Sequence, residues 1–136
     1  MTTQPIRIIL VDDHKLARDA WATLLGYDER FTVIAICGDG QEAIELASQL
    51  QPDIMIVDVN MSPINGFEIT QKVLAENPAV KIIGISINNH PSYASRMLAV
   101  GARGFISKGT SFEEIAKAIV NIHGGGEYRC PDTRFE

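Results

Sequence analysis

The most constraining feature of this sequence is a short apolar run, residues 54–57, that ends at Asp58. The run is rich in β-branched residues and does not alternate with polar side chains, which is typical of a strand buried on both faces of a parallel sheet. The following Ser62-Pro63 and Asn65-Gly66 pairs cannot continue a strand. Asp58 is therefore expected at the carboxyl end of a central strand, where open α/β folds bind ligands. On this stretch alone, a turn-forming aspartate is the simpler interpretation.

Similar apolar runs recur along the chain and alternate with helical patterns. Further strands are predicted at Ile6–Val11, Phe31–Cys37, residues 81–87 and Gly104–Ser107. Amphipathic helices are predicted at residues 15–25, 66–76 and 92–100, after the turn at residues 38–40, and from Ser111 to the glycines at residues 124–126. Ser111 and Glu114 have the spacing of a capping box at the start of the last helix. The alternation predicts an α/β fold, a doubly wound three-layer domain around a five-stranded parallel sheet.

Composition limits the cellular setting and the partners. The 136 residues, 46% hydrophobic and 21% charged, suit one globular domain. No apolar stretch reaches membrane-spanning length and the N-terminus lacks the regions of a signal peptide, so a cytoplasmic protein without membrane contact is expected. The net charge of −5 offers no basic surface for nucleic acid. A buried thiol at Cys37 and an incidental tail thiol at Cys130 are favoured over a disulfide or a metal site.

Polar side chains follow four of the predicted strands. Asp12 and Asp13 follow the first strand, and Asp58, Ser86 and Lys108 come at the ends of the third, fourth and fifth. The carboxyl ends of parallel strands meet at one edge of the sheet, so these side chains are expected to converge. Three adjacent carboxylates repel and raise each other's pKa. A hard cation with few protein ligands, most simply Mg²⁺, would relieve that repulsion.

This set of groups predicts phosphoryl transfer onto an aspartate. Asp58 would be the nucleophile, Lys108 would hold the anion, and the Ser86 hydroxyl would hydrogen-bond to it. Simpler roles are helix capping for the first acidic pair and a local backbone bond for Ser86. His14 is expected to tune the acidic pair or to pack on the helix, because no second histidine is close in sequence.

The sequence resembles the receiver domains of two-component response regulators over nearly its whole length. The residues that carry the resemblance are Val11-Asp12-Asp13-His14, Asp58 with the loop at residues 61–66, Ser86, and Phe105-Ile106-Ser107-Lys108. The first helix and the tail look most like the branch with a LuxR-type helix-turn-helix output domain. The resemblance implies a flavodoxin-like sheet of order 2-1-3-4-5, a receiver over residues 1–124, and a linker-like tail over residues 125–136 with the output domain absent.

The resemblance also implies roles for individual residues. Asp58 would accept a phosphoryl group from a sensor histidine kinase, and Lys108 would contact that group. Asp13 and Asp58 would ligate Mg²⁺ directly together with the backbone carbonyl of Asn60, while Asp12 would act mainly through water.

A switch pair, Ser86 and Phe105, is implied for the output. Phosphorylation would draw the Ser86 hydroxyl inward, and the Phe105 ring would rotate into the vacated space. A homodimer would then form through residues 88–100 and 104–108, or through the first and last helices. Transcription would be controlled through DNA bound only by a C-terminal output domain.

Some residues depart from the usual receiver pattern without removing a catalytic group. Gly109 replaces a frequent proline, Phe105 replaces the commoner tyrosine, and Ser62 and Asn65 replace a proline and an aspartate. Three alternatives stay open: a single-domain or interaction-only receiver, a phosphatase or phosphotransferase acting through an aspartyl phosphate, and a flavin or nucleotide module. The adjacent acids after the first strand would repel a nucleotide phosphate.

Overall fold

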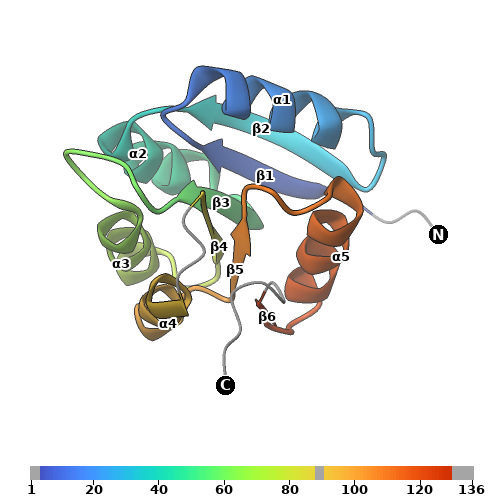
Figure 1. Cartoon of the computed structure of the whole chain (residues 1–136). Coiled ribbons are helices and arrows are strands. Elements are labelled where there is room, and N and C mark those ends of the chain that lie inside the picture. The colour runs from blue at the N-terminus through green and yellow to red at the C-terminus, as the bar shows by residue number, and fades with distance from the viewer. Residues whose placement is uncertain (1–3, 88–90, 130–136) are drawn as a thin grey trace.

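The protein forms one parallel sheet between two layers of helices (Figure 1). The computed structural model describes residues 4–87 and 91–129. The strands are β1 (Ile6–Val11), β2 (Phe31–Cys37), β3 (Ile54–Asp58), β4 (Lys81–Ser86), β5 (Gly104–Ser107) and β6 (Tyr128–Arg129). The helices are α1 (Lys15–Gly26), α2 (Gly40–Leu50), α3 (Gly66–Glu76), α4 (Pro91–Ala99) and α5 (Phe112–His123).

The sheet has the order β2-β1-β3-β4-β5-β6, and every neighbouring pair is parallel. The predicted five-stranded order 2-1-3-4-5 is therefore confirmed. All five residues of β3 are buried, as its unbroken apolar run predicted, because strands and helices enclose it on every side. The edge strand β2 has intermediate and exposed positions in its middle, since only one neighbour covers it.

Two separate apolar cores lie on the two faces of the sheet. Helices α1 and α5 cover one face, and α2, α3 and α4 cover the other (Figure 1). Alternate residues of the central strands point to opposite faces, so both cores draw on the same strands. Ile9, Val11, Met55 and Val57 join the core under α2–α4, whereas Ile8, Leu10, Ile54 and Ile56 join the core under α1 and α5.

The short strand β6 extends the sheet beyond the five strands predicted from the sequence. It pairs with β5, with Gly104 opposite Tyr128. The Tyr128 hydroxyl lies 2.5 Å from Glu114 Oε2, which ties the strand to α5. The linker role of residues 125–136 stays a prediction, and residues 130–136, with Cys130, lie outside the described residues. The loop at residues 88–90, with His90, lies outside them as well.

The capping box lies at a different helix from the predicted one. Ser111 accepts a hydrogen bond from the Glu114 N–H at 3.2 Å, but the Glu114 carboxylate binds Tyr128. The full reciprocal box occurs at α3, where Asn65 accepts from the Glu68 N–H and Glu68 accepts from the Asn65 N–H. A tertiary partner has therefore displaced the local bond at α5.

The first turn of α1 lies outside the core. Leu16 is 87% exposed, because this turn lies past the carboxyl end of β1 and has no strand beneath it. Trp21, one turn further, is partly buried against the core and stacks on Phe112 of α5 with ring centroids 6.4 Å apart. Trp21 therefore packs at the flank of the core.

Cys37 is a buried thiol, as predicted, at the end of β2. Burial raises the pKa of Cys37 from its ordinary value of 9.0 to about 11. Since the thiolate is the reactive form, we expect Cys37 of a Cys130→Ser variant to react with iodoacetamide at pH 8 about 100-fold more slowly in the folded protein than in guanidinium. Mass spectrometry of the alkylated fraction measures both rates. Equal rates would contradict a buried thiol.

The same shift predicts the sign of a pH effect on stability. Because folding disfavours the Cys37 thiolate, its contribution is fully present below pH 9.0 and is lost as the pH rises towards about 11. A Cys37→Ser variant should lack this component of the alkaline loss.

Candidate functional site

Four polar side chains meet at the carboxyl edge of the sheet, as the sequence predicted. Asp58 and Ser86 are the last residues of β3 and β4, while Asp12 follows β1 and Lys108 follows β5. Parallel pairing of β1 with β3, β3 with β4 and β4 with β5 brings these strand ends side by side. Asp12, Asp58 and Ser86 are buried.

Lys108 lies between two buried carboxylates. Its Nζ is 2.9 Å from Asp12 Oδ2, 3.1 Å from Asp12 Oδ1 and 3.2 Å from Asp58 Oδ2. Only 12% of the Lys108 side chain is exposed, so it is not a solvated surface lysine. The ammonium offsets the charge of the acidic residues in this structure and stands within reach of an anion attached to Asp58.

The two buried aspartates are shifted in opposite directions. Burial raises the pKa of Asp58 above its ordinary 3.8 and the Asp12 charge adds to this, although the Asn60 N–H and Lys108 oppose it. Burial would also raise the pKa of Asp12, but the His14 N–H and Lys108 bring that pKa below its ordinary value. The increase in pKa expected from charge repulsion is therefore found at Asp58 and not at Asp12. Asp12 loses its proton more readily than Asp58 does. Asp58 is left as a desolvated carboxylate.

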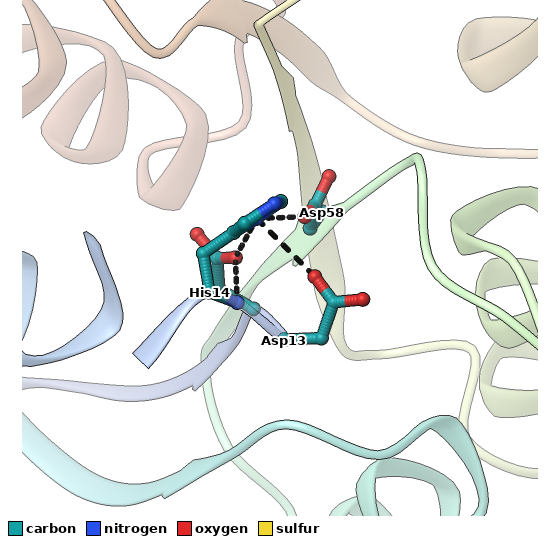
Figure 2. Close-up of side chains that lie close together, drawn as sticks. Asp13, His14 and Asp58 are labelled. Atoms are coloured by element: carbon teal, nitrogen blue, oxygen red, sulfur yellow. Dashed lines mark hydrogen bonds and ion pairs between the residues drawn. The ribbon is translucent and has the colours of Figure 1, made fainter. Parts of the chain in front are cut away.

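The His14 side chain lies within ion-pair distance of three carboxylates, which the sequence did not indicate (Figure 2). Its Nδ1 lies 3.2 Å from Asp12 Oδ1, 3.2 Å from Asp13 Oδ1 and 3.6 Å from Asp58 Oδ2. His14 is also the N-cap residue of α1, and its side chain caps no backbone group there. The Asp12 carboxylate accepts from the His14 N–H at 2.9 Å, so it orders the strand-to-helix turn. The capping alternative for the acidic pair is not observed.

Asn60 links the phosphoacceptor candidate to Ser86. Its backbone N–H donates to Asp58 Oδ1 at 3.0 Å, and its side-chain amide donates to Ser86 Oγ at 3.1 Å. From the sequence, only the Asn60 carbonyl was expected to have a role. Its polar side chain two residues beyond Asp58 was the one signal for this second contact.

Gly66 packs directly against the backbone of Asp58 and Val59. A Cβ atom at this position would lie 2.7 Å from the Val59 Cα and 2.8 Å from the Asp58 carbonyl oxygen. The Gly66 N–H donates to the Val59 carbonyl at 2.9 Å, which closes the loop that contains the cis Ser62–Pro63 peptide. The loop glycine is therefore required by close packing against the strand end.

Phe105 is fully buried in β5. Its ring joins the core under α2–α4 together with Met97. Both side chains lie so close to Gly84 that a Cβ atom at this position would meet them. The predicted rotation of this ring on phosphorylation stays a prediction; in this structure the ring is already buried. A phenylalanine has no hydroxyl group that burial would leave without a hydrogen bond, which removes the cost of holding it there.

The donor atoms of the acidic group fit a divalent cation. Asp12, Asp13, His14 and Asp58 each offer one ligand atom, and these four atoms lie within 4.8 Å of one another. Asp12 Oδ2 is buried and accepts no hydrogen bond from residues 4–87 or 91–129, although Lys108 forms an ion pair with it. A buried carboxylate oxygen without a hydrogen bond retains its capacity to ligate a metal.

Among the described residues, none of the helices has both the length and the apolar character needed to cross a membrane.

Comparison with known proteins places the chain among signalling domains. Residues 8–120 match the family described as the response regulator receiver domain. The chain is 33% identical to the transcriptional regulatory protein DegU of Brevibacillus brevis over 93% of its own length and 53% of DegU. It is 35% identical to LnrK of Bacillus subtilis over 93% of its length and 58% of LnrK. The chain thus spans about half the length of these relatives.

Solved structures agree with this placement. A LuxR-family two-component response regulator from Aurantimonas superposes with a TM-score of 0.91 at 28% identity, covering 96% of this chain and 93% of that one. The receiver domain of the response regulator NarL from Mycobacterium tuberculosis superposes with a TM-score of 0.86 at 27% identity, covering 90% and 99% of the two chains.

Proposed function

Because the chain belongs to the family of response regulator receiver domains, we propose that Asp58 accepts a phosphoryl group from a sensor histidine kinase. The observation that carries this proposal is the contact of 3.2 Å between Asp58 Oδ2 and Lys108 Nζ at the carboxyl edge of the sheet. A buried nucleophilic carboxylate beside a fixed ammonium is the arrangement that an in-line transfer of a charged group requires.

In the proposed reaction, one Asp58 oxygen forms a bond to phosphorus. The bond between phosphorus and the donor histidine nitrogen breaks, and that nitrogen takes up a proton. Lys108 would move its contacts from the carboxylates to the phosphoryl oxygens. Ser86 Oγ already accepts from Asn60, so its own hydrogen is the one we expect to donate to a phosphoryl oxygen.

Mg²⁺ is the proposed cofactor. Asp13, Asp58 and the Asn60 carbonyl would hold it directly, and Asp12 would act through water. Their oxygen donors suit a hard cation. When bound, the cation supplies positive charge for the phosphoryl oxygens and offsets repulsion between the acidic residues.

The output is proposed to begin at Ser86. Attraction of its hydroxyl to a phosphoryl group would compete with the Asn60 contact and shift the end of β4. Phe105 lies beside Gly84 of the same strand and beside Met97 of α4, so this shift would reach α4 through packed side chains. The part of Phe105 in the switch, including its rotation, stays a prediction.

The partners of the whole protein belong to the same proposal. They comprise the kinase, a homodimer formed on phosphorylation, and DNA bound through a C-terminal output domain. A cytoplasmic location also stays a prediction. The control of transcription is supported by relatives such as DegU and LnrK, which are named as transcriptional regulatory proteins.

The proposal is tested by incubating the protein with acetyl phosphate and Mg²⁺ and recording its intact mass. We expect the wild type to gain one phosphoryl group with Mg²⁺ and none with EDTA. Asp58→Asn should gain none, whereas the control Asp19→Asn, on the exposed side of α1 beside Lys15, should behave as wild type.

Two outcomes would contradict the proposal. A mass gain that persists in Asp58→Asn would place the acceptor elsewhere. No gain in the wild type, from either acetyl phosphate or a phosphorylated histidine kinase, would indicate an interaction-only receiver. Steady release of phosphate from small phosphate esters would favour an enzyme instead.

A further inference from the structure

The feature that the proposed function leaves unused is the segment after α5. Residues 124–129 form a strap that turns back from the end of this helix and lies along the edge of β5 (Figure 1). The Tyr128 N–H donates to the Arg103 carbonyl at 2.9 Å, and Tyr128 pairs with Gly104. The strap therefore covers a sheet edge that β5 would otherwise expose.

The strap fits closely against β5 and α5 but is short. A Cβ atom on Gly104 would lie 2.9 Å from the Tyr128 carbonyl oxygen, so a side chain there would push the strap away. Asn121 of α5 donates to the Glu127 carbonyl at 3.0 Å, and the Tyr128 hydroxyl donates to Glu114 Oε2 at 2.5 Å. Strand β6 itself has only two residues. Such a short element requires little free energy to open, so a local change elsewhere can shift its docking.

The Glu114 carboxylate has two partners that compete for it. It now accepts from the Tyr128 hydroxyl, but the N-terminus of its own helix offers a second partner. Ser111 Oγ accepts from the Glu114 N–H at 3.2 Å, so half of a capping box is already formed. The other half would be a bond from the Ser111 N–H to the Glu114 carboxylate. The equivalent bond is closed at α3, where Glu68 accepts from the Asn65 N–H at 3.1 Å.

Glu114 therefore has two available positions, and they have opposite effects on the strap. In the first, its carboxylate holds Tyr128 and the strap stays on α5. In the second, its carboxylate closes the capping box and the Tyr128 hydroxyl loses this acceptor. A two-position side chain of this kind can convert a small displacement of a neighbouring loop into docking or release of a segment.

The loop that could decide between these positions contains Lys108. Lys108 and Ser111 both lie in the short connection from β5 to α5. The Thr110 N–H donates to the Ser107 carbonyl at 3.0 Å, which makes this connection a tight turn. In the proposed reaction, Lys108 transfers its contacts from the carboxylates to a phosphoryl group. We expect this movement to displace the turn and to bring the Ser111 N–H towards the Glu114 carboxylate.

We propose that Glu114 switches between Tyr128 and the Ser111 N–H, and that a phosphoryl group on Asp58 favours the second partner and releases the strap. Release uncovers the edge of β5 and frees the following chain from a fixed place on the receiver. The trigger rests on the proposed function, whereas the two positions of Glu114 do not. The simpler interpretation is a strap that only covers the sheet edge.

The first test removes the Tyr128 hydroxyl and keeps its ring. In Tyr128→Phe the Glu114 carboxylate loses its present donor, so it should bind the Ser111 N–H. Exchange of individual amides with water is measured by NMR on the full chain. We expect the amide at position 128 to exchange about 10-fold faster than in wild type, and that of Ser111 about 5-fold more slowly. Circular dichroism checks that the variant is folded.

Glu113→Ala is the matched control for this test. Glu113 is exposed and lies in the same first turn of α5, so its removal changes the charge near the helix N-terminus as a change at Glu114 would. Both amides should exchange as they do in wild type, because Glu113 does not hold the strap.

The second test adds the trigger. Wild type is treated with acetyl phosphate and Mg²⁺, its intact mass is recorded, and amide exchange is measured again. We expect faster exchange at Tyr128 and slower exchange at Ser111, each by about 5-fold or more. Tyr128→Phe should show little further change at either amide, because its strap is already released. Asp58→Asn, treated in the same way, should show none.

The results separate failure of this proposal from failure of the proposed function. A Ser111 amide in Tyr128→Phe that exchanges no more slowly than in wild type would show that Glu114 has no second position. A mass gain without altered exchange at either amide would reject the trigger and leave Asp58 as the acceptor. A missing mass gain would contradict the proposed function and with it the trigger, while the Tyr128→Phe comparison still decides the two positions of Glu114.

Discussion

Replacing Lys108 with methionine is expected to lower the free energy of unfolding by about 3 kcal/mol in metal-free buffer at pH 7. Methionine keeps most of the side-chain volume but removes the ammonium that lies 2.9 Å from Asp12 and 3.2 Å from Asp58. Two buried carboxylates would then face each other without a countercharge. Urea unfolding followed by circular dichroism measures the change.

The pH dependence of this loss has a defined sign. Lys108 is one of the groups that hold down the pKa of Asp58, which is already above its ordinary 3.8. Without Lys108 that pKa should rise further. A carboxyl group with a raised folded-state pKa weakens the fold as the pH rises through that pKa, so the deficit should be smallest in acid and should grow above pH 3.8.

Two further measurements separate the charge effect from general damage. Lys117→Met, which removes an exposed ammonium 3.8 Å from Glu114, should change stability by about 0.5 kcal/mol or less. Mg²⁺ should stabilise Lys108→Met more than wild type, because the ammonium no longer competes for the same carboxylates.

Phosphoryl gain of Lys108→Met from acetyl phosphate should be slower than that of wild type by about 100-fold or more. A variant as stable as wild type at pH 7 would contradict the buried countercharge.

Gly66→Ala is expected to cost about 3 kcal/mol of stability and to slow phosphorylation of Asp58 about 100-fold. The added Cβ would meet backbone atoms, the Val59 Cα at 2.7 Å and the Asp58 carbonyl oxygen at 2.8 Å. Backbone cannot turn aside as a flexible side chain can, so the strand end must shift and carry the acceptor carboxylate with it. Urea unfolding and the rate of mass gain measure the two effects.

Gly26→Ala is the matched control. This glycine ends α1, and a Cβ there would have nothing within 4 Å. Alanine has the better helix propensity, so we expect unchanged or slightly higher stability, by up to about 1 kcal/mol, and an unchanged phosphorylation rate. Equal effects of the two substitutions would show that the loop below Asp58 does not position the acceptor.

The acceptor site could be predicted from sequence because its parts follow strand ends. In a parallel sheet, Asp12, Asp58, Ser86 and Lys108 converge once the alternation of strands and helices is recognised. Periodicity and polar residues at strand ends are local signals, so they can be recognised in a single sequence. The same reasoning predicted the buried Cys37, whereas the strand order that the structure confirms was implied by the resemblance to receiver domains.

Other features depend on distances that the sequence does not encode. The Glu114 carboxylate could cap α5 or bind Tyr128, and only the position of β6 decides between them. Burial acts to raise the pKa of both Asp12 and Asp58, and the His14 N–H and the Lys108 ammonium reverse that effect at Asp12, whereas the Asn60 N–H and Lys108 do not reverse it at Asp58.

The sequence by itself determined the layers and the identity of the acidic and basic groups, because each follows from local pattern and chain direction. The strand order was implied by the resemblance to receiver domains. Only the tertiary structure decided that Phe105 is already buried, that Asn60 holds Ser86, and that the His14 imidazole turns into the acidic pocket. Side-chain direction at a strand end is set by packing from several elements at once, and no single segment contains that information.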